Sequence, residues 1–154
     1  MHRLATLAGF IVVVALVAFV GARFEPGAWH AALDKPSWNP PSFVFAPVWT
    51  PLYLMIAVAA WRLWPQRHVP RVRTALWLWC AQMLLNAAWS WLFFGRHLPL
   101  AALFDILLLL GVIVAFVIVS WPRDRVAALL FLPYVAWVAF AAALNASIWW
   151  LNRG

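Results

Sequence analysis

The sequence predicts an all-α integral membrane protein, a bundle of five transmembrane helices. Hydrophobic residues make up 68% of the chain and charged residues only 10%, whereas soluble domains are roughly half apolar and about a quarter charged. A helix needs about 20 mainly apolar residues to cross a bilayer. Runs of this kind cover residues 4–24, 43–64, 74–94, 98–121 and 125–150. No linker is long enough to separate a pair of domains, so we expect residues 1–154 to form one transmembrane domain.

The first run, residues 4–24, follows Arg3 and ends in the small pair Gly21 and Ala22. This is also the pattern of a secretory signal peptide. The apolar stretch is longer than the roughly 7 to 15 residues of a signal-peptide core. We therefore interpret it as a retained first span.

The connection between the first and second runs, residues 25–42, is the only long one. Its end and the start of the second run read KPSWNPPSFVFAPVWTPLY, which is rich in proline and tryptophan. Long loops without obvious structure are often functional. The other breaks, at residues 65–73, 95–97 and 122–124, combine proline, glycine or charge and predict turns.

Basic residues lie between the apolar runs, so the net charge of +7 indicates loop anchors rather than a nucleic-acid partner. If the five runs alternate in direction, one side carries Arg3, Arg62, Arg67, Arg71, Arg73, Arg123 and Arg125, and the other carries Arg23, Lys35, Arg96 and Arg153. The excess predicts an N-terminus inside, with the long loop and the C-terminus outside. We expect a multi-pass protein of the cell membrane rather than of an outer membrane.

Polar and aromatic side chains recur at helical spacing inside the runs. The stripes are Gln82, Asn86 and Ser90 with Trp89 and Phe93 beside them in the third run, Trp137, Ala141, Asn145 and Trp149 in the fifth, and Phe45, Trp49 and Tyr53 in the second. Asp105 is the only acid well inside a span. Polar side chains at membrane depth normally face the bundle interior. Antiparallel spans place these stripes at similar depth, so we expect an aromatic chamber covered by the long loop.

A plainer interpretation stays open for several of these residues. Gln82, Asn86 and Asn145 either join helices by hydrogen bonds or contact a ligand, and a backbone donor or a hydroxyl could satisfy Asp105. Tryptophans at run ends are typical of the membrane interface; these are Trp61, Trp64, Trp121, Trp149 and Trp150. Trp77 and Trp79 cannot both face the interior.

No arrangement typical of a conventional enzyme occurs. His2, His30, His68 and His97 lie in terminal or loop regions without metal-ligand spacing, so we expect no metal site. Cys80 is the single cysteine, and the chain has no glycine-rich phosphate loop and no hydrolase elbow. We expect that no cofactor is required.

Four segments taken together resemble the tryptophan-rich sensory protein family (TspO/MBR), whose animal members are the translocator protein or peripheral benzodiazepine receptor. They are KPSWNPPSFVFAPVWTPLY, QMLLNAAWSWLFFG at residues 82–95, AALFD ending at Asp105, and LPYVAWVAFAAALN at residues 132–145. They follow one another across almost the whole chain. We interpret the chain as a bacterial member.

The resemblance implies a five-helix bundle, commonly a homodimer, whose ligand cavity is closed by the first loop. It implies binding of porphyrins such as protoporphyrin IX and haem, and of benzodiazepine-type and isoquinoline ligands, with cholesterol bound by several members. It also implies a role in tetrapyrrole regulation, transport and stress sensing, and for some members light-dependent degradation of protoporphyrin. In this sequence Trp38 is then a loop-lid residue, Trp49 and Trp137 are the cavity tryptophans of the photochemistry, and the ligand contacts include Asn86, Trp89, Ser90, Ala141 and Leu144.

Binding is the leading hypothesis, with Tyr53, Phe93, Asp105 and Asn145 added to the expected ligand-binding residues. The alternatives are photo-oxidation of a bound porphyrin and transport of a lipid or sterol. The sequence departs from the animal cholesterol-recognition pattern, because Ala146 stands where the tyrosine would fall. Transport ranks below binding because no inverted repeat is visible. In the third run, bulky Trp79 follows Ala75 where close helix pairing of two copies would favour a small residue.

Overall fold

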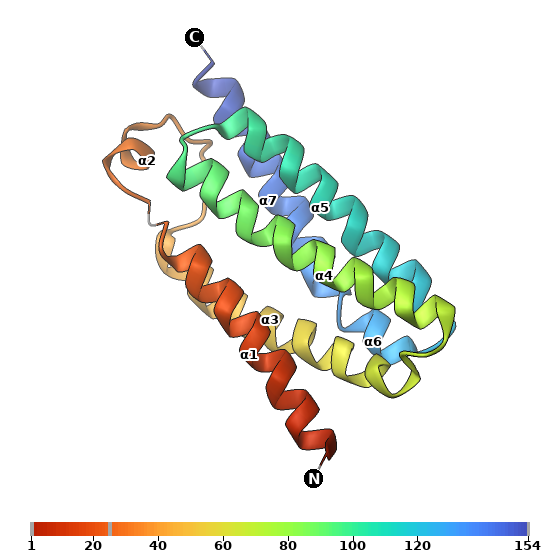
Figure 1. Ribbon diagram of the computed structural model, residues 1–154. Coiled ribbons are helices and arrows are strands. Elements are labelled where there is room, and N and C mark those ends of the chain that lie inside the picture. The colour runs from red at the N-terminus through yellow and green to blue at the C-terminus, as the bar shows by residue number, and fades with distance from the viewer. Residues whose placement is uncertain (1, 25, 154) are drawn as a thin grey trace.

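A computed structural model describes residues 2–24 and 26–153, and within them the chain is helical throughout, without a β-strand (Figure 1). The long helices are α1 (His2–Ala22), α3 (Phe45–Leu63), α4 (Pro70–Ser90), α5 (Pro99–Ser120) and α7 (Leu132–Leu151). Short helices are α2 (Ala28–Ala32) in the first loop and α6 (Arg125–Leu129) before α7. Short 3₁₀ turns, η1 (Ser42–Val44) and η2 (Trp64–Gln66), flank α3, and a π-helical turn, η3 (Trp91–Gly95), ends α4. The predicted all-α class is confirmed.

Helices long and apolar enough to span a membrane cover Arg3–Ala22, Ser42–Gln66, Pro99–Ser120 and Arg125–Leu151. The protein is therefore an integral membrane protein. Helix α4, the third predicted span, is also 21 residues long but carries Gln82 and Asn86 in its middle and arginines in its first turn, which make it less apolar. Five spans thus remain a prediction.

Prolines explain where the helices differ from the predicted runs. Helix α4 begins at Pro70 rather than Thr74, because proline suits the first turn of a helix, where its missing N–H has no partner to lose. The predicted span over residues 125–150 is confirmed as the apolar helical stretch Arg125–Leu151, but it is interrupted, because α6 ends at Leu129 and α7 begins at Leu132. Pro133 has no N–H to donate to residue 129, so the helix breaks there.

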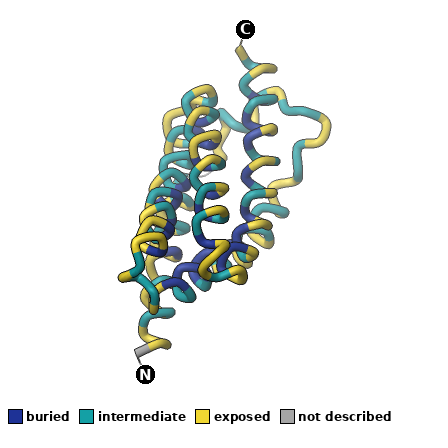
Figure 2. The backbone as a smooth tube through the Cα atoms, turned by 90° about the vertical axis from the view of Figure 1, so that its right-hand side faces the viewer, coloured by how far each residue is buried: buried dark blue, intermediate teal, exposed yellow. Residues whose placement is uncertain are grey.

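The helices pack in an order that leaves α1 at the edge. Helix α1 contacts α3 and α4, α4 packs along α5, α5 along α7, and α6 bridges α3 and α5. Figure 1 shows α2 and the C-terminus at one end of the bundle, which we call the loop end, and the N-terminus, α6 and the α3–α4 connection at the other. Figure 2 shows the chain next to the N-terminus in the colours of exposed and intermediate residues. Among the described side chains of α1, Val14 is the single buried one.

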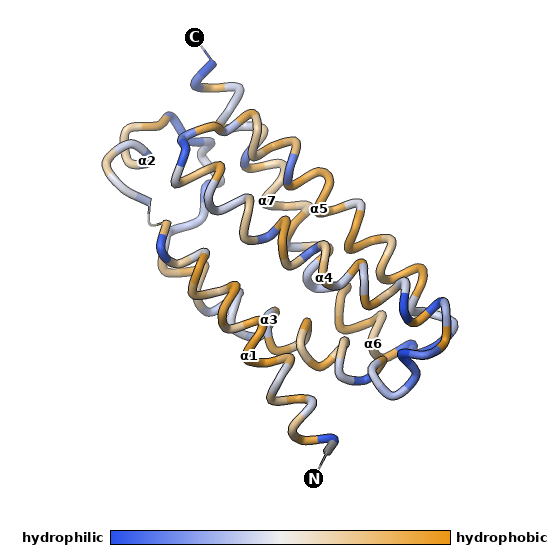
Figure 3. Tube along the Cα trace, viewed as in Figure 1, coloured by the Kyte–Doolittle hydropathy of each residue, from blue (hydrophilic) through white to orange (hydrophobic). Residues whose placement is uncertain are grey.

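The interior is mainly apolar, and the ends of the bundle carry most of the polar residues (Figure 3). Ile56, Leu63, Phe116, Phe131 and Tyr134 are fully buried in one continuous core. Trp77 points outward with 70% of its surface exposed, whereas Trp79 is buried and its indole N–H donates to the Ile56 carbonyl at 2.9 Å. Ala75 is buried as well, so the face carrying Ala75 and Trp79 packs inside the bundle and is not available to a second copy.

Candidate functional site

A chain of hydrogen bonds crosses the middle of the bundle. The Tyr53 hydroxyl on α3 donates to Asn86 Oδ1 on α4 at 3.2 Å, and Asn86 Nδ2 donates to the Tyr134 hydroxyl on α7 at 3.0 Å. The Tyr134 hydroxyl then donates to Gln82 Oε1 at 3.0 Å. Both polar groups of the Asn86 amide are thereby used in joining three helices.

Asn145 makes a second tie between helices. Its Oδ1 accepts the Trp89 indole N–H at 3.0 Å, and its Nδ2 donates to the Pro99 carbonyl at the start of α5 at 2.8 Å. The side chain is 1% exposed. Of the two interpretations that the sequence leaves open for Asn86 and Asn145, interhelical bonding accounts for their polar atoms in this structure.

Two buried polar atoms of the described residues have no hydrogen-bond partner: Gln82 Nε2 and Asp105 Oδ2. Asp105 lies on α5 and is half-buried, whereas Gln82 is fully buried. Among the described residues, neither a backbone N–H nor a hydroxyl donates to this oxygen of Asp105. Buried polar groups are normally paired, so an unpaired carboxylate oxygen inside a span is a place where a polar guest can bind.

A group of aromatic rings fills the space between α3 and α7. We call it the seam cluster, and its members are Phe45, Trp49, Tyr53, Trp137 and Phe140. The Trp49 and Trp137 rings lie 6.5 Å apart at 88°, and Trp49 stacks on Tyr53 at 5.1 Å. The backbones of α3 and α7 hardly approach each other within the described chain, so these half-buried side chains form the contact. Trp38 of the first loop reaches Phe140 at 5.7 Å.

A second aromatic group fastens the first loop to the helices. We call it the latch cluster, and its members are Trp29, His30, Trp89, Phe93, Phe94 and His97. Trp29 of α2 stacks on His97 at 4.3 Å and meets the edge of Phe93 at 5.8 Å. Burial lowers the pKa of His30, and the nearby Lys35 charge lowers it further, so His30 is neutral at pH 7.

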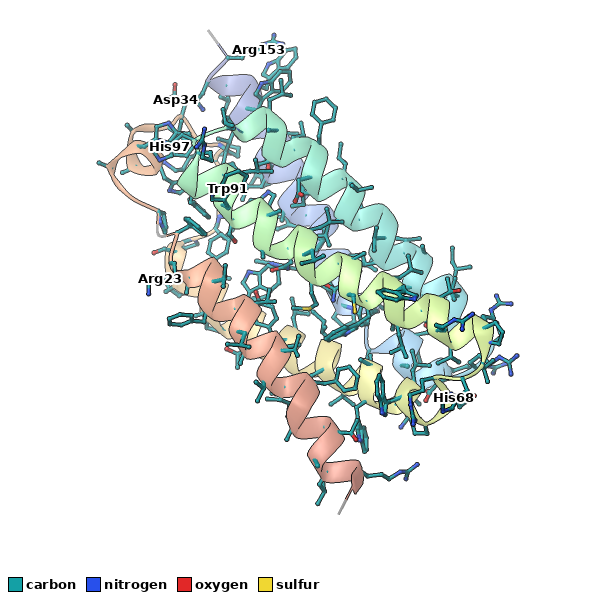
Figure 4. All side chains as sticks on the ribbon, in the orientation of Figure 1. Arg23, Asp34, His68, Trp91, His97 and Arg153 are labelled. Atoms are coloured by element: carbon teal, nitrogen blue, oxygen red, sulfur yellow. The ribbon has the colours of Figure 1, made fainter. Side chains whose placement is uncertain are left out.

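The loop is also fixed to the end of α7. The Asp34 backbone N–H donates to Asn152 Oδ1 at 3.0 Å, and Asn152 Nδ2 donates to the Asp34 carbonyl at 2.9 Å. Figure 4 shows Asp34 and His97 together at the loop end with Arg23 and Arg153 nearby. The loop is therefore held at this end by contacts with η3, with His97 and with α7 and its C-terminal end.

Two cavities border the predicted site. One of about 570 Å³ lies between the loop and α7 and is lined by Pro36, Ser37, Trp38, Ala146, Ser147, Trp150 and Leu151. The other, of about 210 Å³, lies between α1 and α3 and is lined by Tyr53 with Thr50 and apolar residues of both helices. The smaller cavity is lined by a seam residue, Tyr53, whereas the larger one is lined by Trp38, whose ring contacts the seam residue Phe140.

The structure divides the residues that the sequence suggests. Trp49, Tyr53 and Trp137 gather in the seam cluster, and Ala141 lies against the same core. Trp89 and Phe93 belong to the latch cluster, and Leu144 packs with them. Ser90 faces α1, where a side chain at Gly21 would meet its Oγ at 3.3 Å.

Sequence reasoning missed Tyr134, which is fully buried and binds both Asn86 and Gln82. It lies three residues before Trp137, on the same face of α7. Extending the stripe of Trp137, Ala141 and Asn145 one turn toward the N-terminus would have reached it. A tyrosine in an otherwise apolar run was the feature of the sequence that could have identified it.

Comparison with known proteins identifies the family of the chain. The sequence profile of the TspO/MBR family matches residues 10–151. The chain belongs to the TspO/MBR family. The tryptophan-rich protein TspO of Chlorobaculum tepidum is 39% identical over 97% of this chain and 98% of its own length. The translocator protein of Homo sapiens is 37% identical over 95% of this chain and 89% of its own length, and protein CrtK of Rhodobacter capsulatus is 36% identical over 98% and 95%.

Membership in the TspO/MBR family fits the tryptophan content, since 13 of the 154 residues are tryptophan. Several of them form the seam and latch clusters described above, and others, such as Trp77 and Trp150, point outward. The tryptophans of this family member therefore serve at least two purposes, inside the bundle and at its membrane-facing surface.

Proposed function

We propose that the protein binds a flat tetrapyrrole, such as protoporphyrin IX or haem, at the seam cluster. The observation that carries the proposal is the contact between α3 and α7, which consists of aromatic side chains rather than close backbone packing. Rings of this kind can separate and stack on a planar guest, at ~0.5 to 1.5 kcal/mol per pair beyond area burial.

The surroundings of the seam suit the other groups of such a ligand. Its carboxylates would lie toward the loop end, where Arg23, Lys35 and Arg153 supply positive charge. Trp38 and the adjoining cavity of about 570 Å³ would form the entrance under the loop. Asp105 Oδ2, unpaired inside the bundle, can accept from a pyrrole N–H or another donor.

The relatives' names point to a role in signalling or transport, since they include a tryptophan-rich sensory protein of Cereibacter sphaeroides and translocator proteins. We propose that this protein takes part in tetrapyrrole transport or regulation and in stress sensing. We further propose that it acts in the cell membrane and as a homodimer. Light scattering of the purified protein in detergent would measure the mass of the assembly, and a monomer mass would contradict the homodimer.

The binding proposal is tested by titrating the purified protein with protoporphyrin IX and following the shift of the porphyrin absorption band. Trp49→Leu with Trp137→Leu removes two stacking surfaces, so we expect ~1 to 3 kcal/mol weaker binding, about 5- to 150-fold in Kd. The matched control is Trp77→Leu with Trp91→Leu, two outward-facing tryptophans of the α4 and η3 segment. Equal loss in both pairs, or unsaturable binding to the unmodified protein, would contradict a seam site.

A second candidate function is light-driven oxidation of the bound porphyrin. The Trp49–Trp137 pair, with rings 6.5 Å apart, favours it, because an indole in the seam could relay the oxidation. After light excitation an indole would lose one electron to molecular oxygen, and the indole radical would take one electron from the bound porphyrin, so that the porphyrin is oxidised and oxygen is reduced. Illumination of the complex in air should convert the porphyrin bands into a new product only when both tryptophans are present. Equal bleaching with the Trp49→Phe and Trp137→Phe variant would reduce the effect to ordinary photosensitisation.

A further inference from the structure

Charge is divided unevenly between the two ends of the bundle. The end opposite the loop, which we call the arginine end, carries Arg3, Arg62, Arg67, Arg71, Arg73, Arg123 and Arg125 against Asp124 as its one acid, a net charge of +6 out of +7 for the chain. The loop end carries four basic residues and, in sequence, Glu25 and Asp34. Figure 4 shows nitrogen-tipped side chains pointing outward around His68 at the arginine end.

The single acid at the arginine end, Asp124, is already paired within the protein. Asp124 accepts from Arg62 Nε at 3.2 Å through Oδ1 and at 3.0 Å through Oδ2, and its Oδ1 also accepts the Ala127 backbone N–H at 3.0 Å. Its side chain is 12% exposed. Among the described residues, the other arginines at this end therefore have no carboxylate partner.

Several of these arginines are held in place by the protein. Arg71 Nε donates to the Val119 carbonyl at 3.1 Å, which leaves both of its terminal amino groups free of protein partners in the described chain. The Arg67 guanidinium lies over the Trp64 ring at 5.1 Å, and that of Arg125 lies over Trp121 at 5.8 Å. Trp64 and Trp121 both face outward.

These tryptophans set the depth of the guanidinium groups. Outward-facing indoles at the ends of spanning helices sit at the headgroup level of a bilayer, so the arginines above them lie where lipid phosphates lie. A guanidinium binds a phosphate through two parallel N–H donors. Headgroups of the anionic leaflet therefore complement this surface in charge, in donor geometry and in depth.

We propose that the arginine end is a binding surface for anionic phospholipids, which the protein selects over zwitterionic lipids. The positive-inside rule already explains why arginines occur on one side, but it acts during membrane insertion and predicts no lipid preference afterwards. The proposed surface holds the phosphate headgroups through Arg67, Arg71 and Arg125. It is independent of the seam cluster.

The loop end provides a control of lower net charge, because two of its arginines also lie over tryptophan rings but share that end, in sequence, with the acids Glu25 and Asp34. Arg96 lies over the Trp91 ring at 5.7 Å and Arg153 over Trp150 at 3.1 Å. The pair Arg67→Gln with Arg125→Gln and the pair Arg96→Gln with Arg153→Gln therefore remove the same charge and the same kind of ring contact at opposite ends. Both ends of the bundle are accessible to lipid in detergent micelles, so the result does not depend on which end faces the inside of the cell.

The experiment is native mass spectrometry of the full chain released from micelles containing equal amounts of phosphatidylglycerol and phosphatidylcholine. We expect retained lipid to be mainly phosphatidylglycerol, and each arginine near the surface to contribute about fivefold to that preference. Arg67→Gln with Arg125→Gln should reduce it at least about tenfold, and adding Arg71→Gln should reduce it further. The loop-end pair should change it less than about twofold.

Three results would overturn the proposal: equal retention of both lipids by the unmodified protein, equal loss in the two arginine pairs, or retention that does not fall as sodium chloride is raised. Circular dichroism on each variant checks folding. If the arginine-end pair fails to fold, the single variant Arg71→Gln and the salt titration of the unmodified protein decide. Free inorganic phosphate at the same concentration should not displace the lipid, and displacement would indicate a simple anion site instead.

Discussion

The seam and latch clusters are made of the same kinds of side chain but differ in how they are packed. In the latch, the central ring of Phe93 is 2% exposed and sits in a small core with Leu144 and Ile148, while the rings around it are half-buried or, for His97, exposed. In the seam, Trp49 and Trp137 remain half-buried between helices whose backbones stay apart. Aromatic content alone therefore does not identify a ligand site; the packing around the rings does.

This contrast indicates that the two halves of the tryptophan-rich first loop have different structural roles. Trp29 stacks on His97, whose φ of 56° places it in the left-handed region that reverses the chain between α4 and α5. The loop is thus tied to a rigid turn. Trp38, in contrast, touches the seam through Phe140 and stays 46% exposed beside a cavity. We expect latch changes to affect folding and seam changes to affect binding.

The largest expected effect compares truncations in the two clusters. Phe93→Ala removes a fully packed ring and should lower the free energy of unfolding by about 3 to 5 kcal/mol. Trp137→Ala removes a half-buried ring and should lower it by ~1 to 2 kcal/mol. Reversible unfolding in mixed micelles measures both. An equal loss of stability in the two variants would remove the distinction between the clusters.

The next effect tests the polar chain between the clusters. Tyr134→Phe leaves Asn86 Nδ2 and Gln82 Oε1 without a partner, and we expect about 1 to 3 kcal/mol of destabilisation. Tyr53→Phe is the control, because it breaks only the bond to Asn86 Oδ1 at the half-buried edge. It should destabilise by less than ~1 kcal/mol. The same unfolding measurement applies, and a larger loss in Tyr53→Phe would show that Tyr134 is not the centre of the network.

A smaller effect concerns the fit of α1 beside the latch. A Cβ on Gly95 would lie 2.8 Å from Phe24 Cδ1, so Gly95→Ala should destabilise by about 1 to 2 kcal/mol through crowding. Phe24→Leu should relieve it. Gly111→Ala is the control: nothing lies within 4 Å of its added Cβ, and the change should stabilise α5 by ~0.5 to 1 kcal/mol. Destabilisation in both alanine variants would indicate a helix effect unrelated to Phe24.

The smallest effect is pH-dependent and belongs to the latch alone. The pKa of His30 is lowered from 6.5 in the folded protein, so neutral His30 contributes stability above about pH 6.5, and this is lost as the pH falls below that value. The size should be well under about 1 kcal/mol because the ring is partly exposed. The protection of residues 28–34 against hydrogen exchange, measured relative to the intrinsic exchange rate at each pH, should fall on acidification. His30→Gln should abolish that response, and an unchanged response would assign it to another group.

Much of this architecture could be predicted from the sequence, because membrane spans depend on length and apolar content. The polar stripes predicted in the third and fifth runs do face the interior, since Asn86 and Asn145 are buried. The sequence could not show that these amides are used up in bonds to Tyr53, Tyr134, Trp89 and Pro99, since that depends on how the helices are rotated. Nor could spacing separate latch rings from seam rings, because both recur every three or four residues.

Helix α1 leaves the ribosome before the helices it packs against, yet in its described residues Val14 is the one buried side chain. Its contacts are with α3 and α4, which are synthesised later. Because α1 buries so little of its surface, it gains little packing energy until α3 and α4 lie beside it in the bilayer. We therefore expect α1 to take its final position only after α3 and α4 have been inserted.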